Sequence, residues 1–236
     1  MSKYLNKSFI VNLFIILSIF GLDRFTKVYV ISENEKNFKI YDFHNLYKEL
    51  LNFCTVDLSA FYFDIRKDTL YCDPINSEKR KSCVTILNVL LKSLLRWFAP
   101  ILSFTTEEIH QLISKNTKSI HLEKFLTFPD KFKNEQLTER WSQLIKIRDV
   151  CNISIEEKRA NKEIGSSLEA ELKIKLNEKY KDIISKIDLS ELCIVSKTQI
   201  NFDEGSDILV ETKKAPGDKC PVCWKISVEP CERHPQ

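Results

Sequence analysis

Apolar residues recur every three or four positions along a long stretch that begins at Phe43. Residues at this spacing share one side of an α-helix, so the stretch predicts a single helix with a broad apolar face. Asp73 and Pro74 end it, because the residue before a proline disfavours the helical conformation. The apolar positions of this helix are Phe43, Leu46, Tyr47, Leu50, Leu51, Cys54, Leu58, Phe61, Tyr62 and Ile65.

Three further helices are predicted after this one. Ser77 is placed to cap the second, which runs to Pro100, and Thr105–Glu108 has the form of a capping box that opens the third. The fourth extends from about Gln136 towards Lys162. With 4 glycines and 7 prolines, the composition favours long helices over a β sandwich with many turns. Helices with short connections pack as an antiparallel bundle, so we expect a mainly α fold.

The periodicity changes in residues 165–214. Apolar and polar residues alternate over 168–174, which predicts a strand, and 192–200 and 208–212 predict two more. A short helix is predicted at 177–187. These residues therefore predict a small α+β unit that follows the bundle.

The chain ends in CPVCWKISVEPCERHPQ, in which Cys220 and Cys223 form one ligand-type pair and Cys231 and His234 form another. Three thiolates and an imidazole make a closed four-coordinate set, as structural zinc requires. Free thiols and a redox-active Cys-x2-Cys are the alternatives, although no βαβ pattern surrounds the motif and a redox role does not explain the second pair. We expect one structural Zn²⁺, which folds residues 215–236 because this segment is too short for its own core.

The other five cysteines are scattered through the chain and lie mostly in apolar patterns. They are expected to be small buried hydrophobic residues rather than a disulfide framework. Reduced, cytoplasmic chemistry is therefore favoured. These cysteines are Cys54, Cys72, Cys83, Cys151 and Cys193.

The overall charge does not indicate a partner. Lys and Arg number 36 against 33 Asp and Glu, a net charge of +3, so any basic surface must be local. The run Lys79, Arg80 and Lys81 at a helix start is a candidate phosphate contact, with a solvated charged face as the alternative.

Residues 1–36 differ from the rest, with an apolar run at 9–22 that follows Lys3 and Lys7. The run is shorter than the roughly 20 residues that span a bilayer. A buried or interfacial helix and a membrane-targeting segment are the two interpretations. The stretch LFIILSIFGLDRFTKVYV resembles the first transmembrane segment of lipoprotein signal peptidases, but the family's other membrane helices and second catalytic aspartate are absent.

The body of the chain carries a second resemblance. LLNFCTVDLSAFYFDIRKDTLYCD, followed by RWFAPILSFTTEEI, resembles the anticodon-binding helical domain of isoleucyl-tRNA synthetases. SIHLEKFLTFPD and IRDVCNISIEEKRANKEIGSSLEAELKI follow in the order of the same enzymes. The resemblance runs from about residue 37 to the end. It implies a bundle of the class I synthetase anticodon-binding type over 37–164, with tRNA-Ile as its partner.

The C-terminal stretch GDKCPVCWKI resembles the zinc knuckle with which bacterial enzymes of this family end. His234 stands where a cysteine is more usual, which leaves zinc coordination chemically acceptable. The resemblance makes Trp224, Lys225 and Arg233 candidates for stacking on or pairing with RNA. Packing of the Trp224 ring against the knuckle is the alternative.

The catalytic signatures of the family, His-x-Gly-His and Lys-Met-Ser-Lys-Ser, are absent from this sequence, whose single methionine is Met1. The resemblance therefore implies a tRNA-binding C-terminal portion of an isoleucine-tRNA ligase, with ATP bound only by the missing catalytic domain. A separately encoded catalytic half is a candidate partner. The alternatives are a protein tethered to the inner membrane through residues 9–22, and a zinc-ribbon module that binds other proteins.

Overall fold

The computed structural model covers most of the chain after the N-terminal segment. The apolar run at 9–22, and with it the membrane alternative, lies outside the described residues. Among the residues described, no helix combines the length and apolar character needed to cross a bilayer. The described residues are 40–114, 118–128, 134–185, 187–205, 207–231 and 234.

The described residues pack into two units, each with its own core. The first unit extends to Thr138, except for three residues that belong to the second unit, and the second unit continues from Glu139. These three residues are Tyr71–Asp73. The two units are defined by packing and do not test the domain boundaries expected from the sequence, which stay predictions.

The first unit begins with the long helix predicted from the apolar periodicity. It consists of α3 (Phe43–Asn52), a π-helical segment η1 (Phe53–Phe63) and α4 (Asp64–Cys72). The helix ends directly before Asp73 and Pro74, as predicted. The π-helical segment was not predicted: its hydrogen bonds span five residues, and Phe53, Leu58 and Tyr62 within it are buried.

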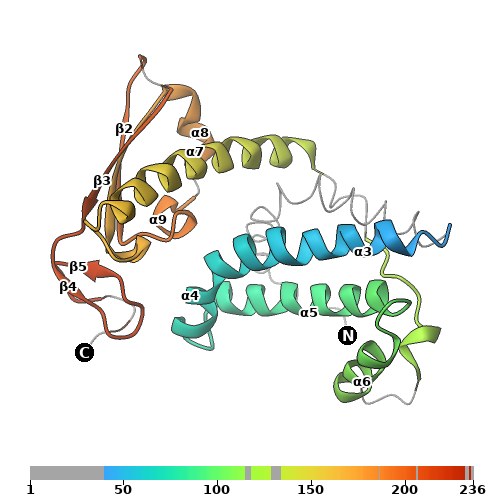
Figure 1. The fold of residues 1–236 in the computed structure, drawn as a ribbon. Helices are drawn as coiled ribbons and strands as arrows, with labels where there is room; N and C mark the ends of the chain where they lie inside the picture. Colours follow the sequence, from blue (N-terminus) through green and yellow to red (C-terminus); the bar gives the residue numbers. More distant parts are fainter. Residues whose placement is uncertain are drawn as a thin grey trace, which may run out of the picture. The chain divides into compact units, whose positions relative to one another are not determined.

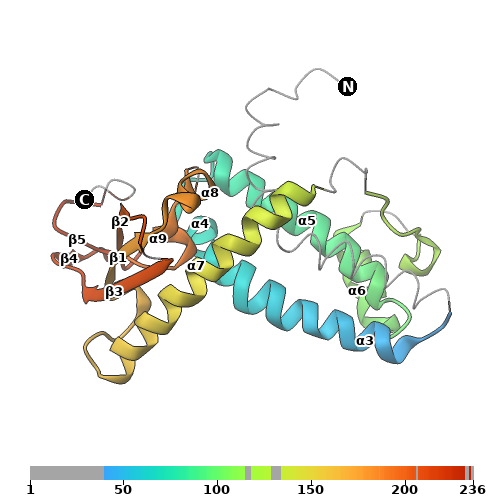
Figure 2. The same ribbon diagram turned by 90° about the horizontal axis from the view of Figure 1, so that it is seen from above.

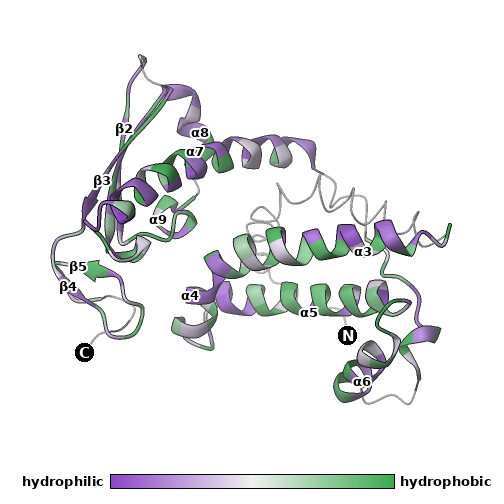
Figure 3. Cartoon of the chain, viewed as in Figure 1, coloured by the Kyte–Doolittle hydropathy of each residue, from purple (hydrophilic) through white to green (hydrophobic). Residues whose placement is uncertain are grey.

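Helix α5 (Glu78–Phe98) returns alongside this long helix (Figures 1 and 2). Ser77 caps it as predicted, since its hydroxyl oxygen accepts from the Arg80 N–H at 3.4 Å. Hydrophobic residues recur along α5 and on the neighbouring helix (Figure 3). Phe53 and Trp97 meet edge to face with ring centroids 6.4 Å apart. The buried core between the helices is Leu46, Leu50, Phe53, Leu58 and Trp97.

The next helix, α6 (Ser103–Ile113), contradicts the predicted capping box. Its N-cap is Leu102, which makes no side-chain cap bond, and Thr105–Glu108 lies inside the helix. Glu107 accepts instead from Ser119 Oγ at 2.8 Å and from the Ile120 N–H at 2.9 Å. The carboxylate is thus used in a tertiary contact with the short 3₁₀ helix η2 (Ile120–Leu122), which local sequence does not reveal.

The second unit is built on α7 (Glu135–Ala160), close to the predicted helix at 136–162. It packs on a three-stranded sheet of order β2-β1-β3. Strand β1 (Ala170–Leu176) lies in the middle, parallel to β2 (Lys197–Phe202) and antiparallel to β3 (Ile208–Lys214). A turn of 3₁₀ helix, η4 (Ser167–Glu169), leads into β1, so this strand starts later than predicted.

Alternation along β1 places every second side chain in the core. Helix α7 runs beside the sheet (Figures 1 and 2), and Ser154 Oγ on α7 is 2.7 Å from Thr212 Oγ1 on β3. Burying these side chains is the main stabilisation of the unit. The buried apolar residues of α7 and β1 are Trp141, Leu144, Ile147, Cys151, Ile155, Ala170, Leu172, Ile174 and Leu176.

Two sequence predictions in this unit need correction. Leu192 ends a short helix, α9 (Leu189–Leu192), and the strand predicted from residue 192 begins only at Lys197. Ile194 has a φ of 56°, which is incompatible with a strand there. The helix predicted at 177–187 is a 3₁₀ turn, η5 (Glu178–Tyr180), that continues as α8 (Lys181–Ile184).

The chain then forms a small hairpin of β4 (Asp218–Lys219) and β5 (Ile226–Ser227). The predicted fold class is confirmed: a helical region is followed by a small α+β unit and a C-terminal cysteine cluster.

Candidate metal centre

The hairpin between β4 and β5 holds the Cys-x2-Cys pair on one tight turn. The Cys220 N–H donates to the Lys225 carbonyl at 2.9 Å, and the Trp224 N–H donates to the Cys220 carbonyl at 3.0 Å. Trp224 closes the turn with a φ of 65°. This left-handed conformation is uncommon for a residue with a side chain, so the turn holds Trp224 in a strained backbone.

Gly217 makes this hairpin possible, and sequence reasoning did not select it. Its φ is +111°, and a Cβ at this position would lie 2.1 Å from the Ser227 carbonyl oxygen. Only glycine allows the two strands to approach this closely. The signal in the sequence is a glycine shortly before a Cys-x2-Cys pair, in a chain with 4 glycines.

The four predicted ligand residues come together in the structure. One ligand atom from each of Cys220, Cys223, Cys231 and His234 can be chosen so that all lie within 4.8 Å of one another. The Cys223 and Cys231 sulfurs are 3.8 Å apart, and His234 Nδ1 is 3.4 Å from Cys231 Sγ and 3.8 Å from Cys220 Sγ. Metal–ligand bonds of about 2.3 Å to sulfur and about 2.0 Å to nitrogen in a tetrahedron give separations of roughly 3.5–3.8 Å. The cluster therefore has the dimensions of a tetrahedral metal site.

The thiols of this cluster are unequal. The N–H groups of Cys223 and Val222 point at Cys220 Sγ and lower the pKa of this thiol to about 6. Burial, together with the neighbouring thiols of Cys220 and Cys231, raises the pKa of Cys223 to about 12. Three thiolates at such separations repel one another, so a bound cation is the natural means of keeping all three ionised.

A serine outside the predicted site attaches the hairpin to the sheet. The Ile226 N–H donates to Ser196 Oγ at 2.6 Å, and the Ser196 hydroxyl donates to the Leu168 carbonyl. The Ile226 side chain is buried. Ser196 and Ile226 are 30 positions apart, so the sequence gives no local signal for this contact.

The candidate RNA-binding residues around the cluster differ in their surroundings. Trp224 is 59% exposed, and Lys219 Nζ lies 5.2 Å from its ring centroid. The ring therefore keeps an accessible face. Lys225 lies near Asp188: burial alone would raise the pKa of Asp188, but hydrogen bonds from Ser190 and the Lys225 charge outweigh it and lower the pKa. Arg233 lies outside the described residues.

The second basic group, Lys79, Arg80 and Lys81, lies in the first turn of α5. These residues belong to the first unit, whereas the cysteine cluster belongs to the second. Lys79 and Lys81 are exposed, and Lys79 and Arg80 both make interactions within the protein.

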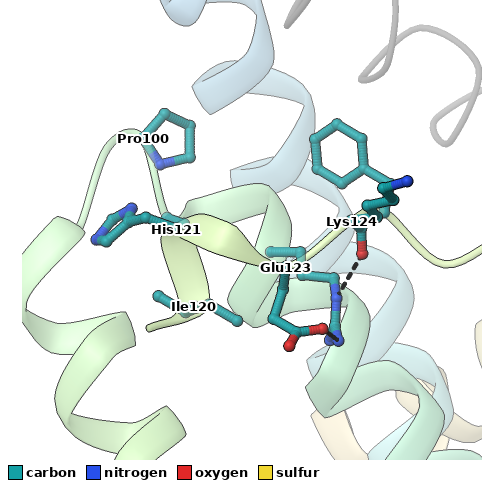
Figure 4. Close-up of a pocket in the computed structure, with 8 residues that line it drawn as sticks. Pro100, Ile120, His121, Glu123 and Lys124 are labelled. Atoms are coloured by element: carbon teal, nitrogen blue, oxygen red, sulfur yellow. Dashed lines mark hydrogen bonds and ion pairs between the residues drawn. The ribbon is translucent and has the colours of Figure 1, made fainter. Parts of the chain in front are cut away.

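A cleft of about 450 Å³ lies beside Pro100 and η2 in the first unit (Figure 4). Arg96 lines this cleft and makes two contacts within the protein. Its Nε donates to the Lys124 carbonyl at 2.8 Å, and its Nη2 forms an ion pair with the Glu123 carboxylate at 3.0 Å. Arg96 also lowers the pKa of Glu123. This network tightens the loop after η2 rather than presenting a free cation to a ligand.

The described residues thus comprise a helical unit and a second unit whose Cys₃His cluster could bind a metal ion. A family model described as the anticodon-binding domain of tRNA ligase matches residues 28–175, which is more than half of the chain. The chain belongs to this family.

Comparison with curated proteins confirms the resemblance to isoleucyl-tRNA synthetases. An isoleucine–tRNA ligase of Pelagibacter ubique is 61% identical over 209 residues, which are 88% of this chain and 23% of that protein. The ligase of Brachyspira hyodysenteriae is 40% identical over 194 residues, 78% of this chain and 21% of that protein. The ligase of Agrobacterium fabrum is 37% identical over 202 residues, 80% of this chain and 21% of that protein. The chain spans about a fifth of the length of the curated relatives it matches.

Proposed function

We propose that this chain is the tRNA-binding portion of an isoleucine–tRNA ligase and that it holds the anticodon arm of tRNA-Ile during ATP-dependent aminoacylation. The observation that carries this proposal is the anticodon-binding match, which spans the bundle and reaches into β1. The 61% identity to an isoleucine–tRNA ligase supports the choice of amino acid.

The metal of this module is one structural Zn²⁺, held by Cys220, Cys223, Cys231 and His234. The donor set and the ligand separations fit zinc, which accepts mixed sulfur and nitrogen ligands in a tetrahedron. When bound, the ion supplies folding energy and fixes the hairpin. The four side chains fill its coordination shell, so they provide shape rather than chemistry.

Trp224 is the residue we assign to RNA stacking, with Arg233 and Lys225 as neighbouring cations. The ring is exposed on a turn whose backbone is strained, a combination that often marks a binding position. Lys79, Arg80 and Lys81 are proposed phosphate contacts of the bundle. The cytoplasm is the setting that we propose, since the relatives are tRNA ligases.

Binding of tRNA-Ile and an unrelated tRNA to the purified chain tests the proposal. We expect clear preference for tRNA-Ile, and about 5- to 150-fold weaker binding by Trp224→Ala, because a base–aromatic stack contributes about 1–3 kcal/mol. Trp224→Phe retains an aromatic face and should keep most of the affinity. Equal affinity for both tRNAs would refute the recognition role, and an unchanged Trp224→Ala affinity would remove the stacking assignment.

A further inference from the structure

The two ring nitrogens of His234 have different partners. Nδ1 faces the cluster, at 3.4 Å from Cys231 Sγ and 3.8 Å from Cys220 Sγ. Nε2 is 3.0 Å from the main-chain oxygen of Cys72. A carbonyl oxygen only accepts, so Nε2 carries the proton and Nδ1 keeps the lone pair that a metal requires.

The partner of Nε2 is the end of a helix. Cys72 is the last residue of α4, and the carbonyl groups in the last turn of a helix commonly accept hydrogen bonds from outside it. The Cys72 thiol also donates to the Val222 carbonyl at 3.8 Å, inside the Cys-x2-Cys turn. Tyr71–Asp73 is accordingly grouped with the second unit. The cluster thus contacts this segment at two points.

We propose that His234 is a positioning residue that couples metal binding to the attachment of Tyr71–Asp73. Metal bound at Nδ1 fixes the plane and tautomer of the ring, which keeps the Nε2–H directed at the Cys72 carbonyl. Without the ion, the ring is free to turn and to move its proton to Nδ1. A cysteine at position 234 completes the same ligand set but has no second atom with which to donate. The inference rests on the zinc proposed above and is independent of RNA binding.

Alkylation of Cys72 by iodoacetamide, followed peptide by peptide with mass spectrometry, measures this attachment. In zinc-loaded protein, we expect His234→Cys to retain about one zinc and to alkylate Cys72 roughly 2- to 10-fold faster than wild type, as expected for one lost hydrogen bond. His44→Cys, the same change at an exposed position of α3, should leave the Cys72 rate unchanged. Buried Cys83 and Cys151 should stay unreactive in every sample, which shows that the fold persists.

Removing zinc from the wild type with a chelator should raise the Cys72 rate to that of His234→Cys, and chelation of the variant should add little. An equal Cys72 rate in zinc-loaded and chelated wild type overturns the inference, whether or not the variant holds zinc. Absence of zinc from the purified wild type removes the metal assignment together with the inference. Failure of tRNA-Ile binding alone leaves the coupling intact.

Discussion

At the scale of single residues, the hairpin that carries the ligands depends on two unusual backbone positions. Gly217 has a φ of +111°, where a side chain would meet the opposite strand, and Trp224 has a φ of 65°. Glycine occupies the first without strain, whereas tryptophan adopts the second at an energetic cost. Two backbone hydrogen bonds support this conformation: the Trp224 N–H donates to the Cys220 carbonyl, and the Cys220 N–H donates to the Lys225 carbonyl.

Gly217→Ala should disrupt the metal site. The added Cβ would lie 2.1 Å from the Ser227 carbonyl oxygen, so the backbone has to move. We expect a loss of about 2 kcal/mol or more in the free energy of unfolding of the second unit, and reduced zinc content. Denaturant unfolding and metal analysis measure both quantities.

Gly205→Ala is the matched control, because its Cβ would meet only the Asp203 carboxylate oxygen, at 3.8 Å. It should change the free energy of unfolding by less than about 0.5 kcal/mol. A Gly217→Ala protein as stable and as zinc-rich as Gly205→Ala would contradict the role given to Gly217.

At the scale of elements, the sequence predicts what is decided locally. Ser77 caps α5 as expected because its partner, the Arg80 N–H, is three residues away. Thr105–Glu108 matches a capping box but lies inside α6, since Glu107 contacts η2 instead. Leu192 is buried in α9 rather than in a strand. The apolar residues around it indicate burial, but a short apolar run does not distinguish a strand from a helix.

The two predicted caps can be compared directly by substitution. Ser77→Ala should lower the free energy of unfolding of the bundle by about 1 kcal/mol, through loss of an N-cap acceptor. Thr105→Ala should change it by less than about 0.5 kcal/mol, because Thr105 is exposed within the helix. Urea unfolding followed by circular dichroism gives both values, and the reverse order of effects would restore the capping box at Thr105.

At the scale of the whole molecule, the fold class and the four ligand-type residues could be predicted from the sequence. The long-range hydrogen bonds that hold the cluster and its hairpin in place could not. Cys72 and His234 are 162 positions apart, and Ser196 and Ile226 are 30 apart. Neither pair leaves a periodic or spaced signal in one sequence. The π-helical segment was missed for a related reason, because its apolar residues also fit an ordinary helix.

The metal content of the whole chain is the corresponding test. We expect about one zinc per chain, and chelation should leave most of the far-ultraviolet helical signal, because the ligands lie outside the helices. Cys220→Ala should abolish stoichiometric zinc, and Cys54→Ala, at a cysteine of the long helix, should not. Full zinc content in Cys220→Ala, or helical collapse on chelation, would contradict this assignment.

The central position of β1 has a consequence for the order in which the chain is synthesised. Both of its hydrogen-bonding partners, β2 and β3, come later in the sequence. A ribosome that stops between Phe202 and Ile208 leaves β1 without β3, so the N–H and C=O groups along one edge of the strand have no partner strand. Such an edge recruits other strands, so incomplete chains of this protein are candidates for aggregation and for removal by quality control.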